Sequence, residues 1–195
     1  MKKLVGLTGK TGAGKSTISK YLQENGAYII DGDIVARQVL VEDKSLLPKL
    51  CEAFGDILNP DGSLDRKKLA KIAFSTSEKT RLLNSLMHPA INDFINSLAQ
   101  KAFESYEVVV VDAAAIIESG FADRCDIMLV VHAPVDVRKA RIMARDNISE
   151  ADALVRINGQ KDDDFYLSRA DYIIRCFEPF DFKEELLPVV KELFS

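Results

Sequence analysis

Cysteine is scarce in this chain, and the three cysteines that occur stand far apart. Cys51, Cys125 and Cys176 are odd in number and form no CxxC pair. Paired or clustered cysteines are what a structural zinc site or the disulfide framework of a small secreted domain requires. The sequence therefore predicts neither, and it is typical of a protein in a reducing cytoplasm.

Long hydrophobic runs and an excess of positive charge are also missing. The apolar run at residues 4–8 is too short for a signal peptide, and no run approaches the length of a membrane span. The chain has 26 Lys and Arg against 30 Asp and Glu, a formal net charge of −4. This balance argues against a general affinity for nucleic acid, so an anionic ligand needs a focused pocket. We expect a cytoplasmic protein.

Strand and helix patterns alternate along the chain. Strand-like runs rich in Val and Ile occupy residues 3–8, 27–30, 107–112, 126–132 and 171–176. They lack the polar alternation of a strand with one wet face, which favours parallel strands covered by helices on both sides. Helical patterns occupy residues 15–24, 33–41, 44–54, 65–74, 78–87, 89–105, 135–146, 150–161 and 182–194. The expected fold is α/β: a five-stranded parallel sheet with the core of a P-loop NTPase, in three layers α/β/α.

The 195 residues contain no repeat, low-complexity tract or flexible linker, which predicts a single domain. Residues 33–105 carry no strand signal and are expected to form a helical substrate-binding insertion, and residues 135–169 a lid. The nucleotide core then comprises residues 1–32, 106–134 and 170–195.

Several local signals mark the ends of the expected helices. Ser75 with Glu78, and Ser149 with Asp152, have the spacing of a capping box. Pro89 suits a first helical turn. Residues 59–62 (Asn-Pro-Asp-Gly) predict a turn between helices of the insertion.

The strongest motif is the run Gly-Lys-Thr-Gly-Ala-Gly-Lys-Ser at residues 9–16, which matches GxxxxGK[ST] in full. It follows a strand run and opens a helix, so its backbone N–H groups can cradle phosphate oxygens at the helix N-terminus. A glycine-rich turn without a ligand is the alternative, but it has no use for the Lys-Ser pair. We expect Lys15 to reach the β- and γ-phosphates and Ser16 to offer its hydroxyl to Mg²⁺. The expected cofactor-binding residues are Gly9, Thr11, Gly12, Ala13, Gly14, Lys15, Ser16 and Thr17.

The run at residues 108–112, four valines followed by Asp112, has the form of a Walker B strand whose carboxylate holds the metal through water. A buried strand that ends in a helix-capping Asp has the same form. Asp112 is therefore a secondary metal candidate, and both interpretations remain open.

Asp31 and Asp33 follow the second strand run, where residues of an open parallel sheet line the ligand crevice. A carboxylate there can accept a proton from an attacking hydroxyl while Lys15 and Mg²⁺ neutralise charge on the transferred group. The alternative is that Asp33 only caps the helix that follows.

Arg138, Arg141 and Arg145 recur at helical spacing and share one helix face. Such a stripe is most often a solvated surface. In a lid, however, one arginine could stabilise phosphate oxygens as they gain charge. His88, placed with Pro89 at an expected helix junction, is a weaker candidate for a substrate contact.

The ordered set of these motifs resembles the dephospho-coenzyme A kinase family over nearly the whole chain. The matching positions are Gly6 to Gly9, Gly12 to Thr17, Asp31 and Asp33, Ala36 to Val39, Phe54-Gly55, Leu64 to Arg66, His88-Pro89, Arg141 to Asp146, Ser149, Arg156-Ile157, Gln160, Ala170-Asp171 and Ile174. The resemblance implies an ATP-dependent kinase that phosphorylates the 3′-hydroxyl of dephospho-coenzyme A, the last step in making coenzyme A.

Carried over by position, the resemblance assigns catalytic roles to three residues. Lys15 binds the phosphates, Asp33 is the base for the ribose hydroxyl, and Arg141 stabilises the phosphoryl group. It implies ATP and Mg²⁺ as cofactors, with Ser16 on the metal, and a substrate site that includes Asp31, Asp33, Arg37 and His88.

The chain departs from the family pattern at three places. Ala114 to Ile117 stand before Glu118 where the family usually has Pro-Leu-Leu, Cys176 stands for an Asn, and Lys10 for the second glycine of the loop.

The expected partners are therefore small molecules, ATP and dephospho-coenzyme A, with no nucleic acid, no membrane and no obligatory protein partner. Two alternatives are another small-metabolite or nucleotide kinase and a P-loop regulatory NTPase. A GTPase is disfavoured because no NKxD-type motif that reads guanine is present.

Overall fold

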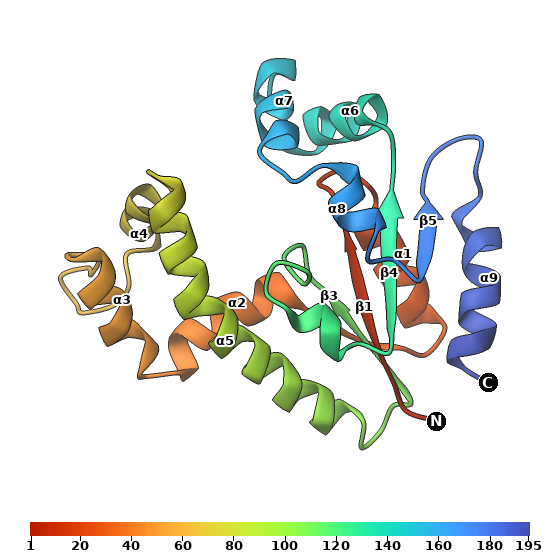
Figure 1. Cartoon of the computed structure of the whole chain (residues 1–195), viewed down its shortest axis with the longest axis horizontal. Helices are drawn as coiled ribbons and strands as arrows, with labels where there is room; N and C mark the ends of the chain where they lie inside the picture. Colours follow the sequence, from red (N-terminus) through yellow and green to blue (C-terminus); the bar gives the residue numbers. More distant parts are fainter. The chain divides into compact units, whose positions relative to one another are not determined.

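Five parallel strands form one sheet, as the sequence predicts. In the computed structural model, which describes all 195 residues, they are β1 (Lys3–Gly9), β2 (Tyr28–Asp31), β3 (Val108–Asp112), β4 (Ile127–His132) and β5 (Tyr172–Arg175). Their order is β2-β3-β1-β4-β5, and every neighbouring pair is parallel. Helices cover the sheet in a three-layer α/β arrangement (Figure 1). The expected fold class is confirmed.

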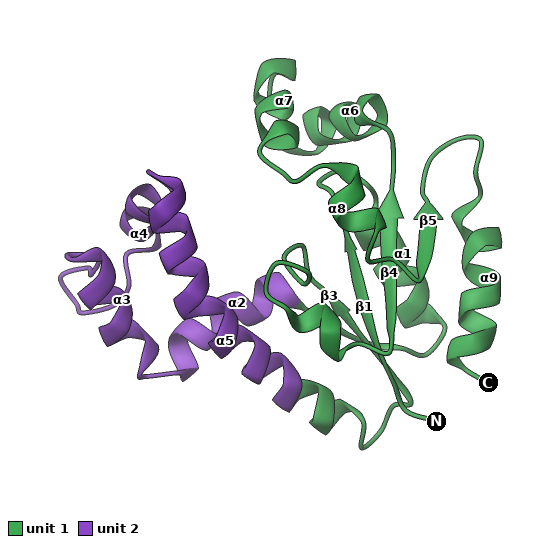
Figure 2. Ribbon diagram, in the orientation of Figure 1, with its two compact units in different colours: residues 1–31, 98–195 green, residues 32–97 purple.

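The chain divides into two compact units (Figure 2). The first comprises residues 1–31 and 98–195 and contains the whole sheet; the second comprises residues 32–97. The second unit is therefore one continuous segment inserted between the two segments of the first.

The core of the first unit forms because its three central strands, β1, β3 and β4, are buried on both faces. The valines of β3 at positions 108–111 are all fully buried. Helices α1 (Lys15–Glu24) and α9 (Phe182–Leu193) bury Ile18, Leu22, Leu186 and Val189 in the same cluster. Burial of one such side chain contributes roughly 1.5–3 kcal/mol.

The segment after β4 in the first unit is helical. Helix α6 (Val135–Asp146) is followed by α7 (Glu150–Asn158) and the short α8 (Asp163–Leu167), and a 3₁₀ turn, η1 (Phe121–Arg124), precedes β4. Ile142, Ala153 and Ile157 form a small core of their own between α6 and α7. Ser149 caps α7, as expected, by accepting a hydrogen bond from the backbone N–H of Asp152. The sequence patterns predict neither α8 nor η1.

The second unit is helical apart from one isolated antiparallel β-bridge between Leu58 and Leu64. It contains α2 (Gly32–Glu42), α3 (Leu46–Phe54), α4 (Arg66–Ala73) and most of α5 (Ser77–Ala102), which continues into the first unit. Its buried cluster includes Leu46, Leu50, Ile57 and Leu69. The expected turn at residues 59–62 is present: the Gly62 N–H donates to the Asn59 carbonyl (2.9 Å).

Two expectations about α5 are wrong. The sequence predicts separate helices at residues 78–87 and 89–105, but Pro89 lies inside one continuous helix. Its apolar positions on both sides of Pro89, including Met87 and Ile91, pack on the same core, and this packing outweighs the missing hydrogen bond of a proline inside a helix. The first-turn cap is also one residue later than expected, because Thr76 Oγ1 rather than Ser75 accepts from the Lys79 N–H (3.2 Å).

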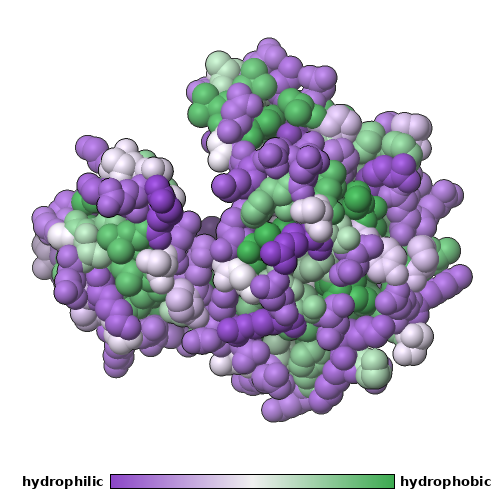
Figure 3. All heavy atoms as spheres, in the orientation of Figure 1, coloured by the Kyte–Doolittle hydropathy of each residue, from purple (hydrophilic) through white to green (hydrophobic).

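The outer surface is mainly polar on the face drawn in Figure 3, where apolar residues show only as patches between hydrophilic ones. No helix of the structure combines the length and the apolar composition that crossing a membrane requires.

Candidate active site

The phosphate-binding motif lies where the topology of the sheet creates a crevice. Strand β1 pairs with β3 on one side and with β4 on the other, so the chain leaves β1 at the point where the strand order reverses. Ligands of open parallel sheets bind at this switch point, beyond the carboxyl ends of the strands. Residues 10–14 connect β1 to α1 there.

Two glycines give this loop its shape. Gly12 has φ +77° and Gly14 has φ +108°, a region that other residues rarely adopt. Neither position has room for a side chain. A Cβ on Gly12 would lie 2.7 Å from the Arg138 carbonyl oxygen, and one on Gly14 would lie 2.7 Å from Cys176 Sγ. The loop is therefore wedged between the start of α6 and the end of β5.

The N-terminus of α1 is open to an anion. Gly14 occupies the N-cap position and has no side chain to accept from the first-turn N–H groups, and no acidic residue stands in that turn. These N–H groups and the helix dipole favour negative charge at this end. Lys15 is half-buried, whereas Ser16 and Thr17 are exposed.

A pocket of about 420 Å³ lies along α1, from Ser16 to Glu24, and is also lined by Phe182 and Lys183. Its other lining residues are Thr17, Lys20 and Tyr21. The ring of Tyr21 meets that of Phe182 edge to face at 5.8 Å between centroids. The volume of this pocket falls within the range of small-molecule sites.

The arginine stripe on α6 is only partly a solvated surface. Arg145 is exposed and pairs with Asp146, but Arg138 is 1% exposed and Arg141 is half-buried. The solvated interpretation is therefore wrong for Arg138. This could not be read from the spacing, because all three arginines share one helix face.

Arg141 contacts the phosphate loop through backbone carbonyls. Its Nη1 donates to the carbonyl oxygens of Gly12 (3.2 Å) and Ala13 (3.1 Å), and its Nη2 donates to that of Cys176 (2.6 Å). The guanidinium thus ties the loop to the end of β5 and places a fixed positive charge against the phosphate loop.

The segment around α8 also contacts the loop, and no sequence pattern predicts these contacts. Gln160 Oε1 accepts from the Thr11 backbone N–H (2.8 Å), and Asp163 Oδ1 accepts from Lys10 Nζ (2.9 Å). This ion pair holds the pKa of Asp163 below its usual value, with His132 and Arg138 as weaker causes. Lys10, a departure from the family pattern, is thus engaged with α8.

The other two departures are accommodated locally. Cys176 is buried in the main core beside Gly14. The carbonyl of Ala114 accepts from Thr8 Oγ1 at 3.3 Å. Glu118 accepts from the Tyr166 hydroxyl (3.4 Å), and burial followed by this carboxylate raises the pKa of Tyr166 to about 12.

Asp31 and Asp112 end neighbouring strands. They are register partners on β2 and β3, so both carboxylates lie at the carboxyl edge of the sheet. No α-helix begins directly after Asp112, and a turn follows it instead. The helix-capping interpretation of Asp112 is therefore wrong.

The remaining candidates, Asp33, Arg37 and His88, belong to the second unit. Helix α2 begins at Gly32, so Asp33 lies within its first turn and not at the N-cap position that the capping alternative requires. Asp33 and Arg37 are exposed. His88 lies inside α5 and not at a helix junction, and burial lowers the pKa of its imidazole.

The residues present fit a magnesium ion that arrives with a nucleotide. No group of three or more His, Cys, Asp and Glu residues could hold a metal ion alone. Mg²⁺ usually keeps several waters and binds through one or two protein oxygens plus substrate phosphates. The exposed Ser16 hydroxyl and the carboxylate of Asp112 are donors of this kind.

Comparison with known proteins gives one consistent result. The family model described as dephospho-CoA kinase (CoaE) matches residues 3–177. The dephospho-CoA kinase of Corynebacterium jeikeium is 42% identical over 171 residues, covering 87% of this chain and 88% of the relative. That of Listeria innocua is 37% identical over 176 residues, covering 89% and 88%.

Solved structures agree. TT1252 from Thermus thermophilus superposes with a TM-score of 0.83 at 25% identity, covering 100% of this chain and 98% of the other. The dephospho-CoA kinase of Campylobacter jejuni gives 0.71 at 28% identity, covering 99% and 98%. Shikimate kinase from Acinetobacter baumannii shares the fold alone, with a TM-score of 0.52 at 14% identity, covering 100% and 94%. With its phosphate loop at the switch point of the sheet, this chain is a kinase and belongs to the dephospho-CoA kinase family.

Proposed function

We propose that this enzyme transfers the γ-phosphate of ATP to the 3′-hydroxyl of dephospho-coenzyme A, giving coenzyme A and ADP. The observation that carries the proposal is the complete phosphate loop between β1 and α1, in a chain that matches this kinase family over residues 3–177. We also place the reaction in the cytoplasm, because all three cysteines are free thiols.

The loop and α1 bind the nucleotide. Phosphate oxygens accept from the N–H groups at the start of α1, and Lys15 neutralises the β- and γ-phosphates. The nucleoside occupies the 420 Å³ pocket beside Ser16 and Thr17. Ser16 and Asp112 would hold Mg²⁺, which would reduce the negative charge on the phosphates.

Asp33 is the general base of the proposed reaction. Its carboxylate accepts the proton of the acceptor hydroxyl as the oxygen attacks phosphorus. Asp31, Arg37 and His88 contribute to the site of the acceptor. Arg141 adds positive charge from its position on the loop carbonyls, and residues 135–169 act as a lid.

The activity is tested with the purified protein, Mg-ATP and dephospho-coenzyme A in an assay that couples ADP release to a spectrophotometric signal. We expect ADP and coenzyme A to form in equal amounts. Absence of turnover with dephospho-coenzyme A, but turnover with another small-metabolite acceptor in the same assay, would replace the proposed substrate. Slow hydrolysis that no acceptor accelerates would instead favour a regulatory NTPase.

The base is tested by Asp33→Asn. We expect kcat to fall by about 10²–10⁴-fold, the usual contribution of a general base, while the affinity for ATP changes little. The matched control is Glu42→Gln, which removes a carboxylate charge from the exposed far end of the same helix. A near wild-type kcat for Asp33→Asn would remove Asp33 from the mechanism.

A further inference from the structure

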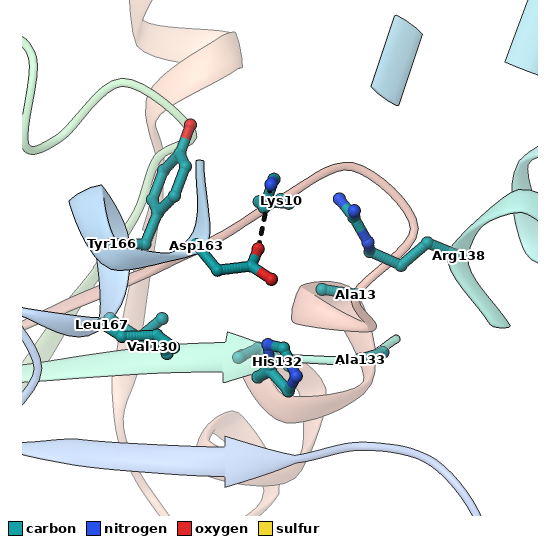
Figure 4. A pocket seen from close by; sticks show the side chains of 10 residues that line it. Lys10, Ala13, Val130, His132, Ala133, Arg138, Asp163, Tyr166 and Leu167 are labelled. Atoms are coloured by element: carbon teal, nitrogen blue, oxygen red, sulfur yellow. Dashed lines mark hydrogen bonds and ion pairs between the residues drawn. The ribbon is translucent and has the colours of Figure 1, made fainter. Parts of the chain in front are cut away.

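A partly buried cluster of charged side chains lies beside the phosphate loop. A cavity of about 10 Å³ is lined by Lys10 from the loop, Arg138 from α6 and Asp163 from α8, together with His132 and Tyr166. Figure 4 shows the Arg138 guanidinium and the Lys10–Asp163 pair facing the same space. Two cations therefore lie beside one carboxylate, and only Lys10 pairs with it.

The two cations are unequally satisfied. The ammonium of Lys10 donates to Asp163 Oδ1 at 2.9 Å. Arg138 is only 1% exposed, yet its Nε and Nη1 have no hydrogen-bond partner. Burial lowers the pKa of Arg138, and the nearby carboxylate of Asp163 opposes this effect. Leaving the donors of a buried charge unpaired is costly, so this arrangement favours any change that gives Arg138 an acceptor.

We propose that Lys10 is an additional phosphate-binding residue, which Asp163 holds in the nucleotide-free enzyme and releases to ATP by pairing with Arg138 instead. The number of ion pairs rises in this exchange. Before it, Lys10 is paired and Arg138 is not; after it, Lys10 binds a phosphate oxygen and Arg138 pairs with Asp163.

The position of Lys10 supports this role. It is the second residue of the loop that cradles the phosphates, and its flexible four-carbon stem carries a compact charge suited to phosphate. The side chain of Asp163 is 44% exposed, so surrounding atoms do not confine it to its present ion pair. Arg138 and Asp163 line the same cavity, so rotation of the Asp163 side chain can bring its carboxylate toward the guanidinium.

The ligand has the chemistry of a nucleoside triphosphate, so the inference depends on the nucleotide site of the proposed function and not on the acceptor. It is tested by calorimetric titration of the purified enzyme with ATP, ADP and AMP, without dephospho-coenzyme A. For Lys10→Gln we expect about tenfold or greater loss of ATP affinity, the size of a charged hydrogen bond, and about twofold or less for AMP. Lys10→Arg keeps the charge and should retain most of the ATP affinity.

Arg138→Gln tests the exchange. It removes a buried unpaired charge, so the melting temperature of the nucleotide-free protein should stay the same or rise while ATP affinity falls. In an Asp163→Asn background, Arg138→Gln should leave ATP affinity unchanged, because Arg138 acts through Asp163. The matched control is Arg169→Gln, whose exposed guanidinium pairs with Asp123 at the surface of the same unit.

Three outcomes would overturn the proposal. Unchanged ATP affinity in Lys10→Gln removes Lys10 from the phosphate site. Equal losses for ATP and AMP mean that the Lys10–Asp163 pair only shapes the loop. A lower melting temperature in Arg138→Gln with unchanged ATP affinity makes Arg138 purely structural. None of these outcomes bears on the proposed function, because the assay of the unmodified enzyme with dephospho-coenzyme A tests that separately.

Discussion

At the scale of single residues, the phosphate loop is held by close approaches that leave no room for substitution. Gly12 lies against the Arg138 backbone, and Gly14 lies against the Cys176 side chain. The Arg141 guanidinium on α6 also links the loop to the end of β5, because it donates to the carbonyl oxygens of Ala13 and Cys176. The loop is thus pre-shaped by α6 and β5 before any nucleotide arrives, which reduces the conformational cost of binding.

Gly12→Ala tests this packing. The positive φ alone costs about 1–2 kcal/mol for a residue with a Cβ, and the Cβ would also meet the Arg138 carbonyl at 2.7 Å. We expect a fall in the free energy of unfolding larger than the φ cost and loss of ATP binding, measured by urea denaturation and calorimetry.

Gly120→Ala is the matched control for this prediction. Gly120 has a similar φ, +75°, in the same unit, but a Cβ added there would meet nothing within 4 Å. It should therefore show the φ cost alone and retain ATP binding. If both variants lose the same free energy of unfolding, the close approach at Gly12 is not a constraint on the loop.

At the scale of secondary-structure elements, the junction of α6 and α7 is held by a carboxylate between two arginines. Asp146, at the end of α6, pairs with Arg145 beside it and with Arg156 on α7. The Arg145 hydrogen bond, followed by the charges of both arginines, lowers the pKa of Asp146 to about 2. These pairs add to the small apolar core of Ile142, Ala153 and Ile157.

The pH dependence of this junction follows from that lowered pKa. The stabilising effect is fully present above the unfolded value of about 4 and is lost as the pH falls through about 2. We expect the protection of the α7 amides against exchange with solvent to fall over this window. NMR-detected hydrogen exchange measures this change.

Asp146→Asn should give fast exchange in α7 already at about pH 6, well above this window, and remove the pH dependence. Asp136→Asn, which removes a highly exposed carboxylate from the other end of α6, should not. An unchanged exchange rate in Asp146→Asn would show that the apolar contacts alone hold the two helices together.

At the scale of the whole molecule, the protein supplies groups that bind phosphate but no complete metal site. Asp31 and Asp112 end neighbouring strands, and Ser16 lies in the first turn of α1, yet no cluster of three or more ligand side chains exists. Binding of Mg²⁺ should therefore depend on the phosphates of the nucleotide, which supply the missing oxygens.

This dependence is tested by thermal unfolding. Millimolar MgCl₂ alone should leave the melting temperature unchanged, and ATP at about 100 times its Kd should stabilise the protein by about 2.7 kcal/mol. Adding Mg²⁺ to the ATP sample should raise the melting temperature further, and chelation by EDTA should reverse only that increment. A rise with MgCl₂ alone would reveal a preformed metal site, with Asp31 and Asp112 as its first candidates.

The sequence by itself determined the features that depend on local pattern. The phosphate loop needs its glycines and its Lys-Ser pair at fixed spacing, and buried parallel strands need continuous apolar runs, so both could be read from adjacent residues. Helices such as α1 and α6 were expected with the bounds that the structure has. The ordered motifs also indicated the family to which the comparisons assign the chain.

Only the tertiary structure decided which charges meet. Lys10 and Asp163 are 153 positions apart, and Arg141 reaches a loop 128 or more positions away, so no local pattern could pair them. The position of Pro89 was also decided by tertiary structure. Proline disfavours the interior of a helix, but packing of α5 on the core of the second unit keeps Pro89 inside it. Arg138 and Arg145 lie on one helix, yet Arg138 is buried and Arg145 is exposed. This difference depends on what the rest of the chain places against each residue.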